Sequence, residues 1–123
     1  MWYCAHAVLF LQEREGEQKE FVVWEHLYLI EATSPQEAFA KATIRAKQDE
    51  SNDPSFTLND RPVDLRFGCI RKVVECQDFD EQGRPTDGTE LSYTELIVES
   101  PQEFTKLVGG ESAQVIYNEI YDD

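Results

Sequence analysis

The tetrapeptide Ser-Pro-Gln-Glu occurs twice in this chain of 123 residues, at 34–37 and at 100–103, each time directly after an apolar run. A serine at such a place can accept hydrogen bonds from the free amides of a first helical turn, and proline suits the first helical position. The glutamate three residues after the serine completes a capping box. The repeat therefore predicts two strand-to-helix transitions.

Apolar, strand-like runs precede each predicted helix in pairs that fit β-hairpins. The first pair covers residues 2–14 and 19–32, and the second covers 62–77 and 90–100. Residues 56–58 fit a further short strand. This order predicts an α+β fold of two β-β-α units, in which four or five mostly antiparallel strands form one sheet and two helices cover one of its faces.

The length of the chain fits a single domain over residues 1–123. Its two similar halves would span about 1–50 and 62–110, followed by a C-terminal strand or tail at 111–123. The alternation of apolar residues breaks at Gly68, which predicts a β-bulge in the third strand. A domain of this size buries enough surface to fold without a disulfide or a metal.

Acidic side chains dominate the charge, with 25 Asp and Glu against 11 Lys and Arg and a formal net charge of −14. Such a field repels nucleic-acid phosphates and anionic membranes, so we expect neither as a partner. It suits a solvated acidic surface, mimicry of a polyanion, or binding to a basic protein.

The three cysteines, Cys4, Cys69 and Cys76, are an odd number without CxxC spacing. The N-terminus lacks the features of a signal peptide, and no apolar run reaches the ~18 residues that would suggest a membrane span. We therefore predict free thiols in a reducing cytoplasm.

Two-residue periodicity divides the first predicted hairpin into two faces. The odd positions suit contact with an alanine-rich helix. If even positions pair with even ones, the other face holds both tryptophans, both histidines and a cysteine, whereas a one-residue shift would separate them. The aromatic face would comprise Trp2, Cys4, His6, Trp24, His26 and Tyr28. A partner subunit, the C-terminal segment or a ligand must cover it, and a homodimer is the preferred explanation.

Cys4, His6 and His26 are the only candidates for a metal site, because thiolate and imidazole are ligands of zinc. Their spacing matches no established zinc motif, and packing of buried thiols and histidines among aromatic neighbours is the preferred explanation. We therefore assign no metal and no cofactor.

Cys4 and His6 would lie on one side of a strand, but nothing in so acidic a chain lowers the pKa of the thiol. No phosphate-binding glycine loop, serine nucleophile elbow or Walker-type lysine occurs. Arg71 and Lys72 are expected on opposite faces of a strand. We expect no catalytic residues and no enzymatic activity.

The segments "WYCAHAV", "VWEHLYLIEATSPQEAFAKA" and "DPSFTLNDRPVDLRFGCIRKVVEC" stand in an order that resembles a bacterial domain-of-unknown-function family, number 4288. The resemblance covers about residues 2–78 and departs from the family pattern at Asp60, where glycine is expected. It implies a small uncharacterised protein and no catalytic residue. The family's recurring Trp, Glu, Arg and Lys correspond to Trp24, Glu25, Arg71 and Lys72.

These patterns together favour a non-enzymatic binding or regulatory module. It would self-associate through the aromatic face and offer an acidic surface to a basic protein, as a toxin-neutralising immunity protein does. The alternative is a small-ligand or metal-binding protein centred on Cys4, His6 and His26. The binding or interface candidates are Trp2, Cys4, His6, Trp24, Glu25, His26, Tyr28, Arg71 and Lys72.

Overall fold

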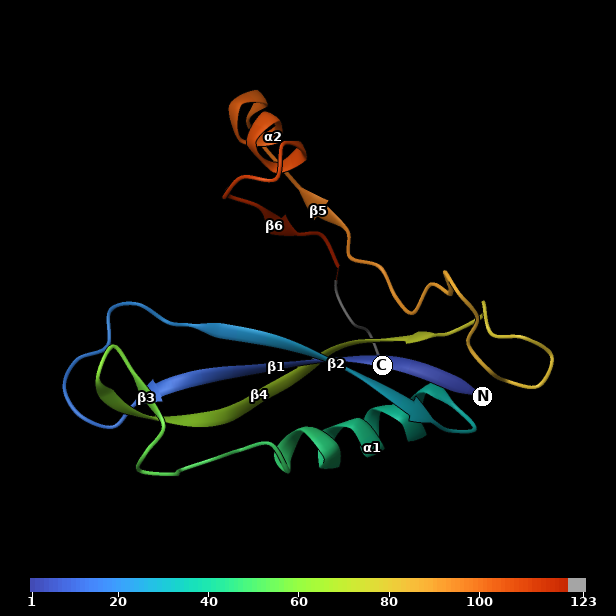
Figure 1. The fold of residues 1–123 in the computed structure, drawn as a ribbon, viewed down its shortest axis with the longest axis horizontal. Coiled ribbons are helices and arrows are strands. Elements are labelled where there is room, and N and C mark those ends of the chain that lie inside the picture. Colours follow the sequence, from blue (N-terminus) through green and yellow to red (C-terminus); the bar gives the residue numbers. More distant parts are fainter. Residues whose placement is uncertain (120–123) are drawn as a thin grey trace. The chain divides into compact units, whose positions relative to one another are not determined.

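The computed structural model describes residues 1–119, which fall into two compact units. The first unit is Met1–Ser92, and the second begins at Tyr93. The first contains β1 (Trp2–Glu13), β2 (Val23–Glu31), α1 (Pro35–Lys47), β3 (Thr57–Leu58) and β4 (Arg61–Glu75). The second contains β5 (Leu96–Ile97), α2 (Pro101–Val108) and β6 (Ile116–Tyr117). The predicted α+β class is confirmed (Figure 1).

Both helices begin at the serines that the sequence marks. The hydroxyl of Ser34 accepts from the amide of Glu37, and the hydroxyl of Ser100 accepts from the amide of Glu103, both at 3.1 Å. The return contact of the capping box is different, because the carboxylate of Glu37 accepts from Thr33 instead of the serine amide. Local chemistry therefore fixes the start of each helix.

Four strands form an antiparallel sheet in the order β2-β1-β4-β3, with β1 and β4 inside and β2 and β3 at the edges. The second predicted hairpin is wrong, because β4 pairs with β1 and β5 pairs with β6. The long strand β1 offers β4 a partner along nearly its whole length, from Tyr3 to Glu13, whereas β5 has two residues. The predicted strand near 56–58 is confirmed as β3, which turns into β4 at Asn59 and Asp60 with φ of 54° and 64°. Positive φ at both positions gives the turn that suits a two-residue hairpin.

The register of β4 against β1 shifts twice. One shift leaves Gly68 without a partner on β1, which confirms the predicted bulge. A side chain at this position would bring its Cβ within 3.2 Å of the carbonyl oxygen of Val8. The second shift, which the sequence pattern did not predict, makes Arg71 the extra residue of a bulge between Lys72, opposite His6, and Ile70, opposite Ala7.

The core lies between α1 and the sheet, where α1 runs along one side of β1 and β4 (Figure 1). Ala42 and Ala46 of the helix meet Ala5, Ala7 and Leu9 of β1, and all five are fully buried. The prediction that odd positions of β1 face the helix is confirmed. We call the opposite side of the sheet the outer face.

The predicted aromatic face is wrong, because even positions of β1 pair with odd positions of β2. Ala7 lies opposite His26 and Ala5 opposite Tyr28, so these aromatic residues share the helix side of the sheet. Leu27 lies opposite His6 on the outer face. The connection between β1 and β2 sets this odd-numbered register, and a shift by one residue exchanges the faces of the whole strand.

The second unit has its own two-stranded sheet and the helix α2. None of the residues of α2 is buried. The single sheet that the β-β-α repeat predicted is therefore divided, because β5 and β6 pair with each other and not with the four-stranded sheet. The predicted last strand is present at β6, and residues 120–123 of the predicted tail lie outside the described part of the chain.

Candidate functional site

The outer face of the first unit carries a group of polar side chains around a buried histidine. His6 is only 1% exposed, and Cys4, two residues earlier on β1, is 2% exposed. An uncompensated polar group in such a place costs free energy, so its partners matter. We call His6, Glu25, Arg71, Lys72 and Ser92 the polar cluster.

Glu25 on β2 connects His6 to Arg71. Its Oε2 lies 2.8 Å from Nδ1 of His6. The guanidinium of Arg71 donates from Nε to Oε1 at 2.6 Å and from Nη2 to Oε2 at 3.0 Å. The side chains of Arg71 and Glu25 are 12% and 19% exposed, so this is a bidentate and largely desolvated ion pair.

The unpredicted bulge in β4 explains how two consecutive residues reach this site. Lys72 lies opposite His6 and is buried, and Arg71 contacts Glu25 from the extra position of the bulge. The prediction that Arg71 and Lys72 occupy opposite faces is therefore wrong. A bulge places two residues of one strand against one of its neighbour and redirects a side chain.

Ser92 completes the cluster from a segment far along the chain. Its Oγ lies 2.5 Å from Nε2 of His6. The preceding residue is also held at the sheet, because the thiol of Cys76 donates to the carbonyl of Leu91 at 3.4 Å. Ser92 itself is half-buried.

Burial lowers the pKa of His6, and the hydrogen bond with Glu25 offsets this only in part. Burial alone would raise the pKa of Glu25, but hydrogen bonds with Arg71 and His6 outweigh it and hold this pKa below its usual value. An ionised carboxylate can only accept, so Nδ1 of the neutral ring must carry the proton. Nε2 is then the acceptor that faces the hydroxyl of Ser92.

The thiols near the cluster are not activated. Burial raises the pKa of Cys4 to about 11, with a further contribution from Cys76. Burial also raises the pKa of Cys76. Cys69 is exposed, and all three cysteines are free.

The other predicted site residues lie elsewhere. Trp24, His26 and Tyr28 occupy the helix side, where Trp24 stacks on His26 and Tyr28 donates to Asp49 beyond the end of α1. Trp2 lies near Phe79, with ring centroids 6.3 Å apart. Because His26 lies on the face opposite Cys4 and His6, these three side chains do not converge, and no group of metal-ligating residues occurs within residues 1–119.

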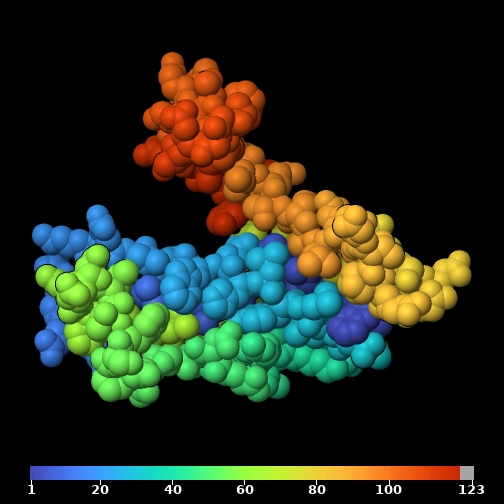
Figure 2. All heavy atoms as spheres, in the orientation of Figure 1, coloured from blue at the N-terminus to red at the C-terminus, as the bar shows by residue number. Residues whose placement is uncertain are grey.

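A strip of aliphatic side chains lies on β2 beside the cluster. Val23, Leu27 and Leu29 are 55%, 52% and 45% exposed. They point to the outer face, since their partners on β1 are Phe10, His6 and Cys4. Figure 2 shows the segment of β2 in blue at the surface of the first unit. We call these three residues the β2 strip.

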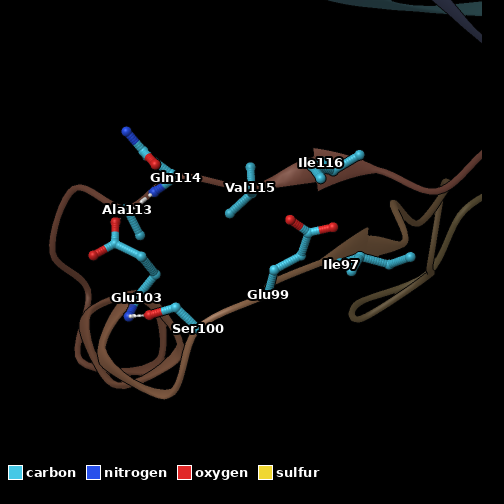
Figure 3. Close-up of a pocket in the computed structure, with 8 residues that line it drawn as sticks. All are labelled: Ile97, Glu99, Ser100, Glu103, Ala113, Gln114, Val115 and Ile116. Atoms are coloured by element: carbon cyan, nitrogen blue, oxygen red, sulfur yellow. Dashed lines mark hydrogen bonds between the residues drawn. The ribbon is translucent and has the colours of Figure 1, made fainter.

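An open cavity of about 680 Å³ lies within the second unit (Figure 3). The carboxylate of Glu103 faces it but accepts from the amide of Gln114 at 2.9 Å and pairs with Lys106 at 3.0 Å. These contacts stabilise the connection between α2 and β6. The residues that line the cavity are Ile97, Glu99, Ser100, Glu103, Ala113, Gln114, Val115 and Ile116.

The fold and the cluster define a small α+β domain with a desolvated ion-pair network on its outer face. The chain belongs to the family described as Domain of unknown function (DUF4288), whose model matches residues 2–92. The match ends where the first unit ends, so it contains the whole polar cluster. No curated protein and no solved structure matches the chain significantly. Within the described residues, neither helix is long and apolar enough to cross a bilayer.

Sequence reasoning identified four of the five residues of the polar cluster, namely His6, Glu25, Arg71 and Lys72, and also the neighbouring Cys4. It missed Ser92, which stands 86 positions after His6 and within no recognised motif. Of the four positions that the family resemblance indicated, Glu25, Arg71 and Lys72 belong to the cluster, and Trp24 does not. The family motifs therefore indicated three members of the cluster, and the periodicity of the first predicted hairpin indicated His6.

Proposed function

We propose that this chain is a protein-binding module that self-associates through β2. The observation that carries the proposal is the exposed β2 strip, because it lies on a strand whose outer edge is paired by no described strand. A free edge offers unpaired backbone amides and carbonyls to a strand of another molecule. Apolar side chains beside such an edge add burial to backbone pairing.

A second copy of the chain suits this surface in spite of its net charge. In an antiparallel pair of β2 strands centred on Leu27, Glu25 would lie opposite Leu29 of the other copy. Glu31 would lie opposite Val23, so no two carboxylates would face each other directly. The surface differs from the aromatic face expected from sequence, because the exposed residues are aliphatic.

The acidic remainder of the molecule would be free for a basic protein, which is the chemistry shared with toxin-neutralising immunity proteins. Association with such a partner should be fast and should weaken as salt screens the charges. The free cysteines of the described chain suit a reducing compartment such as the cytoplasm.

Sedimentation velocity over a range of protein concentrations tests the self-association. We expect the wild type to form dimers and Leu27→Glu to remain monomeric, because the new carboxylates would meet at the twofold axis. Ile44→Glu is the matched control, since Ile44 is also exposed but lies on α1. A monomeric wild type at tens of micromolar, or equal effects of the two substitutions, would contradict the proposal.

A further inference from the structure

We propose that Ser92 is a nucleophile for acyl transfer, with His6 as its general base and Glu25 as the group that orients the base. This inference goes beyond the binding function and does not depend on the β2 strip. It rests on the continuous line of hydrogen bonds from Ser92 through His6 to Glu25, with distances of 2.5 and 2.8 Å.

The order of groups is the one that activates a hydroxyl. A neutral imidazole must present an unprotonated nitrogen to the hydroxyl and hold its other N–H on an acceptor. Glu25 accepts a hydrogen bond from the protonated Nδ1, which leaves the unprotonated Nε2 facing the Oγ of Ser92. The two nitrogens of His6 therefore have the partners that general-base catalysis requires, a carboxylate at one and the nucleophile at the other.

Each group has a defined task in the reaction. Oγ of Ser92 would attack the carbonyl carbon of an ester while its proton passes to Nε2 of His6. The leaving alcohol would take that proton as the C–O bond of the ester breaks. Water, deprotonated in turn by His6, would attack the acyl-serine and release the acid, and the proton would return to Ser92.

Arg71 acts as a positioning residue in this scheme. Its bidentate contact fixes both oxygens of Glu25, so that Oε2 stays at Nδ1 of His6. Lys72, buried opposite His6, adds a second positive charge on the same face of the sheet. The chain as a whole carries a charge of −14, which disfavours anionic substrates. The expected substrates are therefore neutral or cationic carboxylic esters.

A purely structural alternative is that the contact between Ser92 and His6 only fastens the end of the first unit to the sheet. The two roles differ in one respect. A serine that only holds the chain in place does not react with electrophiles faster than an ordinary serine. An activated serine is modified by electrophilic reagents with which ordinary serines do not react.

Labelling with a neutral alkyl fluorophosphonate, followed by intact-mass analysis and peptide mapping, tests the inference on the full-length protein. We expect one phosphonyl group on Ser92, no labelling of Ser92→Ala, and unchanged labelling of Ser112→Ala, since Ser112 is exposed in the second unit. In Glu25→Gln the rate should fall by about 100-fold or more. Circular dichroism would confirm that each variant is folded.

The labelling rate of the wild type should rise with pH as His6 loses its proton and level off at a lower pH than an ordinary histidine would give, because burial lowers the pKa of this histidine. Absence of label on the folded wild type, or labelling spread over several serines, would overturn the proposal. If Ser92→Ala lowered only the melting temperature while the wild type stayed unlabelled, the purely structural role would be the correct one. Neither result bears on the sedimentation test of β2.

Discussion

At the scale of the residue, the ion pair between Arg71 and Glu25 is the feature with the largest expected energetic effect. Both partners are mostly buried, so loss of one leaves a carboxylate or a guanidinium without its charge partner. Removal of one member of a buried pair typically destabilises a protein by about 3–5 kcal/mol, whereas exposed pairs contribute about 0–1 kcal/mol.

We therefore expect Arg71→Ala to lower the free energy of unfolding by about 3 kcal/mol, measured by urea denaturation. Arg61→Ala is the control, because Arg61 also pairs with a glutamate on a neighbouring strand but is 65% exposed. Its effect should stay below about 1 kcal/mol. Similar losses in the two variants would show that the outer-face pair is not desolvated in solution.

The three thiols should react at very different rates. Cys69 is exposed, whereas Cys4 and Cys76 are buried with raised pKa values. At pH 8 a disulfide reagent such as dithiobis(nitrobenzoic acid) should modify one thiol rapidly in the folded protein and three after denaturation. Cys69→Ser should abolish the rapid phase, and its persistence would place Cys4 or Cys76 at the surface.

Acidification should destabilise the protein through His6 and Glu25, because both have folded-state pKa values below their ordinary ones. The unfolded state then binds more protons than the folded state, so stability falls as pH drops. For His6 the loss begins near pH 6.5, and for Glu25 near pH 4.5. Denaturation midpoints of the wild type and His6→Gln between pH 7 and 5 check the first part, since the variant should show the weaker dependence.

At the scale of the element, both the helix starts and the face of α1 could be predicted from sequence, because capping and the small-residue stripe are local. The register of β2 could not. It depends on how residues 14–22 connect two strands, and a one-residue difference moved Trp24 and Tyr28 to the helix side. The bulge at Arg71 could not be predicted either, because no glycine stands at that position. The other bulge in β4 could be predicted from Gly68.

The alanine face of α1 gives a direct test of how closely the helix lies on the sheet. Ala42→Leu should lower the free energy of unfolding by about 1–3 kcal/mol, because the fully buried Ala42 meets β1 and extra methyl groups overpack the core. Ala40→Leu, on the exposed side of the same helix, should be close to neutral. Equal effects, measured by thermal unfolding, would contradict the observed packing.

At the scale of the whole molecule, the described core belongs entirely to the first unit. No residue from 93 to 119 is buried, whereas β1 alone contributes several fully buried side chains. The family match ends at residue 92, at the same boundary. We therefore predict that a fragment of residues 1–92 folds without the second unit.

Urea denaturation of the 1–92 fragment, followed by tryptophan fluorescence, should show a single cooperative transition with a midpoint close to that of the full chain. Trp2 and Trp24 both remain in the fragment and report on opposite faces of the sheet, so their common transition would show that the sheet unfolds as one unit. Ser92 is the last residue of the fragment, and the contact of its hydroxyl with His6 is therefore retained. A broad or absent transition would show that residues after 92 supply stability that the described contacts do not reveal.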